Sequence, residues 1–561
     1  MTKTKQLAAL ALGGVGHIGT NMMVYECNGE YIVVDAGVSF PDEHAPGVDV
    51  IIPDTRFLRD HAKQIKAVFI THAHEDHIGA IGYCWDDFGG APVYASPLAA
   101  MVVQGKLAEL GIKPAQGQIV VTQAKEQYQV GSFSVEYVPV SHSVPESFAL
   151  AIRTPHGTVV HTGDYKFDDA APFGQKTDEA RLAEIGKEGV LAVFGDSTNI
   201  LKLDDSGSEG PVLAHLQKLI NETKGRIVFA AFASHFGRSF AVAAYAASQG
   251  RKVCFLGRTI NKFMTHAKQL GYWPASLQNM VVDAEEISGL PPEKVFIFAS
   301  GTQGEGGSSL TRLSQGADVR GIKLKAGDTV IMSSRMIPGN ERGILNVING
   351  LAMLDVQVIS ELNDRQIHVS GHGGRPEIEK MYGLLKPRYV VPVHGEPLHL
   401  RAHEAFAKAQ GYTPLRVKPG HKLVLAGEGV ESAHTATQTL PHGFNYIDGL
   451  NILEHDPLIL RERKAIGMGG LVAAALPIRK NGQIAGALSL TTRGLIDEVK
   501  QQKLLQLARN RAMQTLETVF PDRRIDNRQQ AAEAIQKALR HTFKVERGKT
   551  PAVLVNWVEI A

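Results

Sequence analysis

Cysteine and long apolar runs are both scarce in this chain. Its three cysteines, Cys27, Cys84 and Cys254, lie far apart, are odd in number and form no Cys-x-x-Cys pair. That pattern indicates reduced thiols in a cytoplasmic protein, with buried and inert side chains. No stretch approaches the roughly 18 uninterrupted apolar residues of a membrane-spanning helix, so we expect no membrane partner.

An excess of charge of either sign is also absent. Lysine and arginine number 59 against 57 acidic residues. The whole-chain charge therefore argues neither for nor against a polyanionic partner, and any nucleic-acid groove must be a local patch. The length of 561 residues exceeds what one hydrophobic core supports, and 44% of the residues are apolar. We expect about two to four domains.

One segment matches the dinucleotide-binding fingerprint, but the sequence that follows it does not fit a dinucleotide-binding fold. Gly14-Val15-Gly16-His17-Ile18-Gly19 has the Gly-x-Gly-x-x-Gly pattern, and Asp35 lies near the offset of a ribose-binding acid. The segment that follows is too short for a crossover helix and contains Asn28-Gly29, the preferred type I′ hairpin turn. We interpret 21–27 and 30–35 as antiparallel strands and the glycines as close-packed turn residues.

Histidine and aspartate are concentrated just after the apolar run 67–70. The segment Thr71-His72-Ala73-His74-Glu75-Asp76-His77 holds three histidines and one aspartate from position 72 onward. If a strand ends there, His72 and His74 can converge on one metal while Asp76 and His77 reach a second. Zinc prefers such ligands, and two ions about 3.5–4 Å apart stabilise both oxygens of a displacement reaction. The segment predicts a metallohydrolase; a histidine-rich surface loop is the alternative.

Later strand ends supply further candidate ligands. They share a place directly after a short strand-like run and are His142, Asp164 and His394. Gly163 permits close backbone approach, and the Asp164 carboxylate has two oxygens with which to bridge two metals. Taken singly, each is more easily an ordinary histidine or a turn aspartate. Their shared placement strengthens the joint case.

The stretch between Asp164 and His394 is far too long for a loop, so a second domain is expected inside the first. Apolar runs alternate there with helical segments, as in a parallel sheet with helical crossovers; the runs are 227–231, 253–256, 295–299 and 330–332. Ligands of such sheets bind beyond the carboxyl ends of the strands. Ordinary strand-to-helix loops also need glycine and serine. A purely structural role for each polar residue after these runs therefore stays open.

A glycine-rich segment precedes the strand-like run that ends just before His394. Residues 368–375 read His-Val-Ser-Gly-His-Gly-Gly-Arg, and Pro376 suits the first turn of a helix running to about Leu385. Exposed amides at that helix start, next to Arg375, would form a phosphate cradle. A plain glycine-rich turn is the alternative.

Together these segments resemble the β-CASP nucleases of the metallo-β-lactamase superfamily, and among them the ribonuclease J family. Nearly the whole chain takes part. The four superfamily motifs are matched in order by 34–37, 71–77, 141–143 and 162–164. The three β-CASP motifs are matched by Asp196 in Gly-Asp-Ser-Thr-Asn, His372 in Ser-Gly-His-Gly-Gly and His394 in Pro-Val-His-Gly-Glu.

The resemblance implies a fold, a metal centre and a substrate. The fold is α/β: a metallo-β-lactamase αββα sandwich with an inserted parallel-sheet β-CASP domain and a small C-terminal α/β domain. The implied cofactors are two Zn²⁺ per chain, with Mn²⁺ as the alternative metal. The implied ligands are His72, His74 and His142 on one ion, Asp76, His77 and His394 on the other, and Asp164 bridging both. The implied contacts to the 5′-monophosphate end of RNA are Ser234, His235, Arg238, His368, Ser370, Gly371, His372 and Gly373.

The order of the apolar runs and the family resemblance together give the expected domain boundaries. Residues 1–205 and 351–430 form the two parts of the metallo-β-lactamase domain, 206–350 the β-CASP domain, 431–454 a linker and 455–561 the C-terminal domain. In that last domain we expect strands at 471–478, 483–490 and 552–559 and helices near 497–519 and 528–542. In the family this domain supports assembly, so a homodimer or homotetramer is expected.

Some residues depart from the family pattern. His17 and Thr20 stand where glutamate and lysine are common, and Ser234-His235-Phe236-Gly237-Arg238 replaces the usual Ser-Asn-Ile-His-Arg. The metal ligands are unchanged. The departures bear on 5′-phosphate discrimination and on the balance between exonuclease and endonuclease action.

The expected activity is metal-dependent RNA hydrolysis in RNA processing and decay, by 5′-to-3′ exonuclease action with an endonuclease action beside it. Asp76, Asp196 and His372 are the candidate catalytic residues. His372 would protonate the leaving 3′ oxygen, Asp196 would orient that imidazole, and Asp35 would support the metal-binding loop. The alternatives are a dinuclear hydrolase of a small thioester or lactone, and a noncatalytic RNA-binding subunit.

Overall fold

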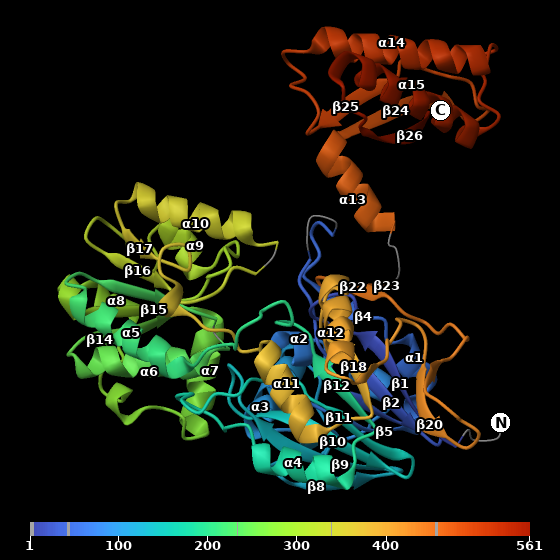
Figure 1. The fold of residues 1–561 in the computed structure, drawn as a ribbon. Coiled ribbons are helices and arrows are strands. Elements are labelled where there is room, and N and C mark those ends of the chain that lie inside the picture. Colours follow the sequence, from blue (N-terminus) through green and yellow to red (C-terminus); the bar gives the residue numbers. More distant parts are fainter. Residues whose placement is uncertain (1–4, 42–44, 233, 338, 455–457, 561) are drawn as a thin grey trace. The chain divides into compact units, whose positions relative to one another are not determined.

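The computed structural model describes all residues except 1–4, 42–44, 233, 338, 455–457 and 561. The chain divides into two units, which are Met1–Ser39 with Val50–Asn445 and Phe40–Asp49 with Tyr446–Ala561. Figure 1 shows the elements of each unit along the chain. The first unit holds all the predicted metal ligands, and the second holds the C-terminal α/β fold.

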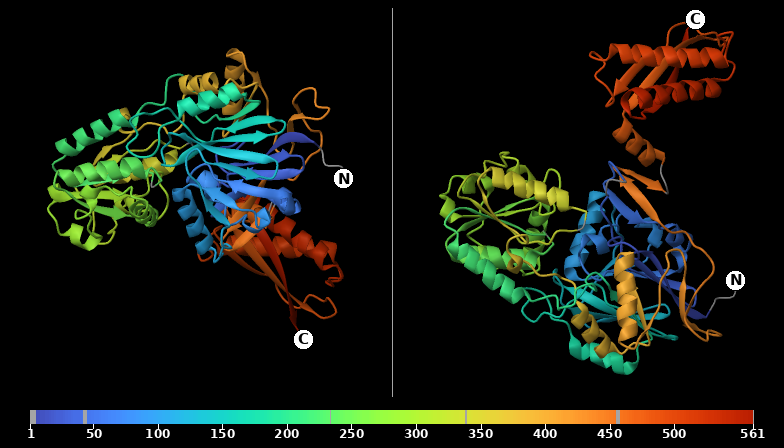
Figure 2. Two further views of the ribbon diagram at one scale, coloured as in Figure 1. Left: turned by 90° about the horizontal axis from the view of Figure 1, so that it is seen from below. Right: turned by 45° about the horizontal axis from the view of Figure 1, so that its top comes forward.

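Two β-sheets packed face to face form the centre of the first unit (Figure 2). In order across the sheet, the larger comprises β21 (His434–Thr435), β20 (Leu423–Gly427), β1 (Gln6–Gly13), β2 (Met22–Cys27), β3 (Glu30–Val34), β5 (Ile65–Phe69), β6 (Val93–Ala95) and β7 (Ile119–Val121). The other comprises β19 (Thr413–Pro414), β18 (Tyr389–Val393), β12 (Ala192–Asp196), β11 (Gly157–His161), β10 (Ser147–Thr154), β9 (Phe133–Val140) and β8 (Gln127–Val130). Inner-face side chains such as Tyr25 on β2 and Phe133 on β9 share one buried core.

Helices cover the outer faces of the sandwich. α4 (Glu179–Glu188), α11 (Arg375–Leu385) and α12 (Pro397–Ala409) lie on the second sheet, where Leu182, Met381 and Ala407 join a core with residues of β11 and β12. α3 (Pro97–Glu109) packs on β6 and β7. Short elements complete this part: β4 (Val50–Pro53), α1 (Arg56–Asp60), α2 (Glu75–Ile78), η1 (Ala62–Gln64) and η2 (Asp86–Phe88). The predicted αββα sandwich is confirmed.

Two strands that end at the candidate site, β12 and β18, are buried on both sides. All five residues of β12 and of β18 are buried, as a parallel strand covered by a second sheet and by helices requires. The predicted hairpin is also confirmed: β2 and β3 pair antiparallel with Cys27 opposite Glu30. Asn28 and Gly29 both have positive φ, 54° and 76°, as a type I′ turn requires. The chain therefore has no dinucleotide-binding crossover at this point.

The inserted domain contains a parallel sheet, as predicted, and β17 (Gln357–Ile359) adds a fifth strand to the four predicted runs. Its strand order is β14 (Lys252–Leu256), β15 (Val295–Ala299), β13 (Ile227–Ala230), β16 (Thr329–Met332) and β17. The helices are α5 (Glu209–Glu222), α6 (Phe236–Ser248), α7 (Arg258–Gln269), α8 (Ala284–Ser288), α9 (Ser309–Ser314) and α10 (Glu341–Met353), with η3 (Ala275–Leu277), η4 (Pro292–Lys294) and η5 (Arg365–Ile367). Because β17 pairs with β16, the inserted sheet extends past the predicted boundary at residue 350, which falls inside α10.

The second unit contains a three-stranded sheet in the order β25 (Ser489–Arg493), β24 (Leu471–Arg479) and β26 (Ala552–Ile560), with α13 (Leu458–Gly469), α14 (Gln502–Val519) and α15 (Arg528–Arg547). The predicted strand 483–490 is wrong over most of its length. Gly482 has φ 85°, and a Cβ there would lie 2.4 Å from the carbonyl oxygen of Ile525. The chain therefore folds back against Ile525 and joins β24 as a strand only from Ser489.

The predicted linker 431–454 contains short strands, β21, β22 (Phe444–Asp448) and β23 (Asn451–Glu454). The predicted start of the C-terminal domain at residue 455 lies outside the described residues. α13, which the sequence analysis did not predict, is the first described helix after it. Within the described part of the chain, every helix is too short or too polar to cross a membrane.

Candidate metal centre

The candidate metal ligands lie at the ends of strands from both sheets. His72 and His74 follow β5, and Asp76 and His77 lie on α2, which begins right after His74. The remaining ligands each follow a strand of the second sheet: His142 after β9, Asp164 after β11 and His394 after β18. Because β11, β12 and β18 are parallel neighbours, their carboxyl ends deliver these side chains to one edge of the sandwich.

The first group of ligand atoms contains three imidazole nitrogens and one carboxylate oxygen. His74 Nδ1 lies 3.2 Å from His72 Nε2 and 3.1 Å from His142 Nε2. Asp164 Oδ2 is 3.6 Å from His72 Nε2 and 3.8 Å from His142 Nε2. Zinc–ligand bonds of about 2.0–2.1 Å place tetrahedral ligand atoms roughly 3.3 Å apart. The spacing of these four atoms therefore suits one zinc-sized cation.

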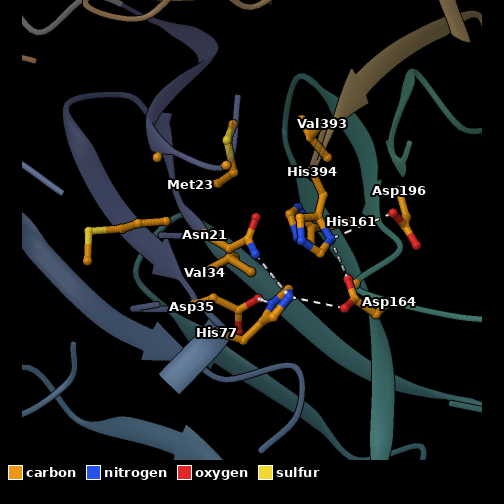
Figure 3. Close-up of a pocket in the computed structure, with 14 residues that line it drawn as sticks. Asn21, Met23, Val34, Asp35, His77, His161, Asp164, Asp196, Val393 and His394 are labelled. Atoms are coloured by element: carbon orange, nitrogen blue, oxygen red, sulfur yellow. Dashed lines mark hydrogen bonds and ion pairs between the residues drawn. The ribbon is translucent and has the colours of Figure 1, made fainter. Parts of the chain in front are cut away.

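The second group shares Asp164 with the first. His77 Nε2 lies 3.2 Å from Asp164 Oδ2 and 3.6 Å from Asp76 Oδ2, and His394 Nε2 lies 3.2 Å from Asp76 Oδ2. Figure 3 shows His77, Asp164 and His394 around a common pocket. Asp164 Oδ2 and His394 Nε2 are both buried and have no hydrogen-bond partner. Buried polar atoms without partners are costly, and a pair of cations between these groups would satisfy them.

Neighbouring groups orient three of the imidazoles. His77 Nδ1 donates to Asp35 Oδ2 at 2.7 Å. Asp35 also accepts a hydrogen bond from the Thr71 hydroxyl, which lies 3.0 Å from His72 Nδ1. His142 Nδ1 donates to the Gly371 carbonyl oxygen at 2.7 Å. In each case the proton is held on Nδ1, so that the lone pair of Nε2 points into the site, as metal coordination requires.

The two groups differ in electrostatic character. Burial lowers the pKa of His72 and of His142 well below its usual range, and burial lowers the pKa of His74 to about 4. Burial also opposes protonation of His394, but Asp164 and Asp76 outweigh it and raise the pKa of His394 to about 10. The imidazoles of the first group are therefore neutral and able to coordinate, whereas the carboxylates of Asp76 and Asp164 favour a positive charge in the second group.

His372 and Asp196 lie beside the metal groups. His372 Nδ1 donates to Asp196 Oδ2 at 2.7 Å and lies 3.8 Å from Asp164 Oδ2. The other carboxylate oxygen of Asp196 accepts hydrogen bonds from the amide and the hydroxyl of Thr198. Burial alone would lower the pKa of His372, but Asp196 and Asp164 outweigh it and raise that pKa. This geometry leaves Nε2 of a protonated imidazole able to donate to a reacting group.

The glycine-rich loop before β2 supports His394. The His394 amide donates to the Gly14 carbonyl oxygen at 2.7 Å, and the Gly16 amide donates to the Gly395 carbonyl oxygen at 3.0 Å. His17 and Thr20, the residues that depart from the family pattern, are hydrogen-bonded to each other through their side chains. The fingerprint-like glycines thus shape the backbone next to a candidate ligand, and His394 itself has a positive φ of 52°.

Family models match four consecutive segments of the chain. Their descriptions and ranges are metallo-beta-lactamase superfamily, 15–220; ribonuclease J, beta-CASP domain, 224–351; Zn-dependent metallo-hydrolase RNA specificity domain, 362–417; and ribonuclease J C-terminal domain, 458–560. Ribonuclease J of Sinorhizobium meliloti is 36% identical over 562 aligned residues, covering 99% of this chain and 98% of that protein. The chain belongs to the ribonuclease J family.

Two further comparisons agree with this membership. Ribonuclease J of Mycolicibacterium smegmatis is 34% identical and covers 99% of this chain and 97% of that protein. A crystal structure of a protein of unknown function from Enterococcus faecalis shares the fold, with a TM-score of 0.50 at 17% identity over 75% of this chain and 100% of that one. The resemblance drawn from the motifs is confirmed, and the chain is a metal-dependent hydrolase of the ribonuclease J family.

The predicted substrate residues of the ribonuclease J β-CASP loop lie mostly inside the protein. Arg238 is fully buried. Its guanidinium donates to Glu209 at 2.9 Å, to Ser333 Oγ at 3.2 Å and to His368 Nδ1 at 2.7 Å. This arrangement does not support the predicted direct contact of Arg238 with RNA and instead makes it an anchor for His368. His235 is also buried, whereas Ser234 is partly exposed.

The predicted phosphate cradle at the start of α11 is wrong. The amides of His372, Gly373, Gly374 and Arg375 donate to Ser370 Oγ, the Tyr165 carbonyl, Glu377 Oε2 and the Lys202 carbonyl, respectively. Because each of these N–H groups already has a partner within the protein, none is free to bind an anion there. Gly371, also predicted to contact substrate, instead accepts the hydrogen bond of His142.

Several supporting residues of the site were not predicted from the sequence. The Asn21 side chain donates to the Asp76 carbonyl at 3.0 Å, and the Asn199 side chain donates to Ser370 Oγ and to the His372 carbonyl at 2.8 and 2.7 Å. Tyr25 shares a buried hydrogen bond with His161 behind Asp164. Asn199 lies within a β-CASP motif, which is a usable signal. The other contacts join segments far apart in the chain and could not be found by spacing.

Proposed function

We propose that this ribonuclease J family member binds two Zn²⁺ per chain and hydrolyses RNA, 5′-to-3′ from monophosphorylated ends and also at internal bonds. The observation that carries the proposal is the carboxylate of Asp164, which belongs to both groups of ligand atoms and has a buried oxygen without a partner. The first ion would be held by His72, His74 and His142 and the second by Asp76, His77 and His394.

Two divalent cations held by these residues would supply an activated water and positive charge for the phosphoryl group. Other residues of the chain hold the ligand side chains in position. Asp35 keeps the protons of His77 and Thr71 in place, and Asn21 fixes the turn that carries Asp76. Asp164, at 2% exposure, is buried between the two groups of ligand atoms.

His372 is the proposed acid. Its Nδ1–H is held by Asp196, so Nε2–H can be given to the 3′ oxygen that leaves when the P–O bond breaks, and the carboxylate of Asp196 stabilises the imidazolium before transfer. The products are a 3′-hydroxyl and a 5′-phosphate.

The 5′ end of the RNA would lie along the segment from His368 to His372, next to Ser234. Two observations support this placement. The family model for an RNA specificity domain begins at residue 362, and Arg238 donates to Nδ1 of His368. Because burial and Arg238 lower the pKa of His368, that imidazole is neutral, with its remaining proton on Nε2 available to a phosphate oxygen.

We further propose that the chain assembles as a homodimer or homotetramer through its C-terminal domain. One face of the β24–β26 sheet is covered by α14 and α15. On the other face Leu554, Val558 and Ile560 are 54%, 44% and 39% exposed and lie beside Ala473 and Pro477. An apolar sheet face of this kind is typical of a protein interface.

The decisive experiment uses 5′-labelled RNA carrying a monophosphate or a triphosphate, with wild-type protein and two variants. Asp164→Asn should reduce cleavage by at least about 10³-fold, because a bridging charge is lost. Asp169→Asn, at an exposed aspartate of the same segment, is the matched control. Release of nucleoside 5′-monophosphates, faster from the monophosphorylated RNA, supports the proposal. Intact RNA with metal-loaded wild-type protein overturns it in favour of a small-ester hydrolase or an RNA-binding subunit.

A further inference from the structure

Glu377 is a buried carboxylate beside the site that the mechanism above does not use. It lies in the first turn of α11 and is 5% exposed. Its Oε1 accepts hydrogen bonds from the Phe167 amide at 3.1 Å and the Ser206 hydroxyl at 2.7 Å. Its Oε2 accepts from the amides of Ser206 and Gly374, each at 2.7 Å. All four donors are uncharged, because three are backbone amides and one is a hydroxyl.

These donors come from three separate segments of the active site. Phe167 follows Asp164 in the loop after β11, Ser206 lies in the segment that follows Asp196, and Gly374 lies in the loop that carries His372. One carboxylate thus joins the chain segments that carry the bridging ligand, the orienting aspartate and the proposed acid. Hydrogen bonds to a charged acceptor are about twice as strong as those between neutral groups. The contacts of Glu377 therefore hold these three segments together at one junction.

The loop 371–374 depends on close packing at this junction. A Cβ at Gly374 would lie 2.0 Å from the Asp204 carbonyl oxygen, and one at Gly371 would lie 2.8 Å from the His142 ring. The Gly371 carbonyl and the His372 ring make their contacts from this loop, with His142 and Asp196 respectively. Because Gly374 is only two residues from His372, a displacement at the Gly374 end of the loop moves the proposed acid away from Asp196.

We propose that Glu377 is a positioning residue that fixes His372 at the distance needed to protonate the leaving oxygen. It acts through the Gly374 amide and the 206 segment and does not contact the substrate. The inference rests on the role of His372 in the proposed function. Glu377→Gln keeps the size of the side chain but turns an NH₂ group toward N–H and O–H donors, so at least one oxygen's contacts are lost.

The test compares two substrates whose leaving groups differ in their need for an acid. RNA leaves a basic 3′ oxygen that needs a proton, whereas the p-nitrophenyl ester of uridine 5′-monophosphate leaves a stable phenolate. Glu377→Gln should slow RNA cleavage by about 10- to 100-fold, because part of the roughly 10²- to 10⁴-fold contribution of a general acid is lost, and the loss should appear in kcat rather than KM. Cleavage of the ester should change by less than about threefold, because metal ligands stay in place. Glu379→Gln, an exposed glutamate of the same helix, is the matched control and should leave both rates unchanged.

His372→Ala and the double variant separate this inference from the proposed function. His372→Ala should show the same substrate dependence, and His372→Ala/Glu377→Gln should be no slower than His372→Ala alone. If His372→Ala affects both substrates equally, the proposed acid is wrong and the inference falls with it. If His372→Ala discriminates but Glu377→Gln does not, only the inference is overturned. Ser206→Ala, which removes a single bond to Glu377, should give a smaller loss in the same direction and serves if Glu377→Gln does not fold.

Discussion

Asp35 shows how much of the candidate site depends on single side chains. Its carboxylate accepts the proton of His77 and, through the Thr71 hydroxyl, orients His72. The backbone of Asp35 adopts a positive φ of 64°, an uncommon conformation for a residue other than glycine. The sequence analysis predicted that Asp35 supports the loop, and these contacts explain how it does so.

At the residue scale, the pairing of His372 with Asp196 makes a pH-dependent prediction. Asp196 raises the pKa of His372 against the effect of burial, so the acid form persists to higher pH with the carboxylate than without it. Asp196→Asn should therefore move the alkaline limb of the kcat/KM profile for RNA cleavage to lower pH. At pH 8 the rate should fall by about 10²-fold, the usual contribution of a general acid, and the loss should shrink toward pH 6.

This prediction is tested by measuring kcat/KM for RNA cleavage from pH 5.5 to 9 for the wild-type protein and the Asp196→Asn variant, with the Asp169→Asn variant as control. An alkaline limb that stays in place, or moves upward, contradicts the assignment of His372 as the acid.

Residues at strand ends were predictable, whereas their supports were not. His72, His142, Asp164 and His394 follow buried apolar runs, so a pattern along the chain was sufficient to place them. Asn21 and Glu377 reach the site through contacts between distant segments. Glu377 carried a weak signal, since a glutamate at the third position of a helix is typical of a capping box, but its bonds to Phe167 and Ser206 depend on the tertiary fold.

At the scale of elements, one hydrogen bond joins the inserted domain to a metal-binding loop. The Tyr272 hydroxyl, in the segment after α7, donates to Glu146 at 2.7 Å. Glu146 lies in the loop between β9 and β10 that also carries His142, and it accepts the Leu98 amide of α3 at 2.7 Å. The contact therefore connects α3, the His142 loop and the inserted domain.

Tyr272→Phe removes only the hydroxyl of this contact. It should lower the free energy of unfolding by about 1–2 kcal/mol, since a hydrogen bond to a buried carboxylate is lost. Tyr245→Phe is the matched control, because the Tyr245 hydroxyl accepts a hydrogen bond from the exposed Asn221 within the inserted domain. Urea denaturation measures both. Equal losses for the two variants would contradict a joining role for Tyr272.

Elements with strong periodicity were predicted better than elements set by tertiary contacts. The buried strands β5, β12 and β18 stand out as apolar runs, and the parallel inserted sheet followed from their alternation with helices. β25 was misplaced because Gly482 turns the chain back across Ile525. α13 was missed because its sequence is largely exposed and lacks a clear apolar stripe.

At the scale of the whole molecule, the near balance of 59 basic and 57 acidic residues means that recognition must come from local surfaces. The family membership accounts for the order of the domains along the chain, whereas their exact boundaries stay predictions. The cytoplasmic location also stays a prediction.

The proposed assembly can be tested at the open face of the C-terminal sheet. Leu554→Glu with Val558→Glu should convert the protein to monomers, because charges would be placed in an apolar interface. Val545→Glu, at a 60% exposed position on α15, is the control and should leave the mass unchanged. Light scattering coupled to size exclusion measures the outcome. A monomeric wild-type protein, or double-variant oligomers of wild-type mass, would contradict this interface.

The most direct test of the central claim is a titration of metal-free protein with Zn²⁺, in which RNA cleavage is measured at each metal-to-chain ratio. If two groups of ligands share Asp164, the rate should stay low at one equivalent, rise to a plateau at two and vanish again on chelation. A plateau at one equivalent, or no cleavage at two with Zn²⁺ or Mn²⁺, would contradict a dinuclear ribonuclease.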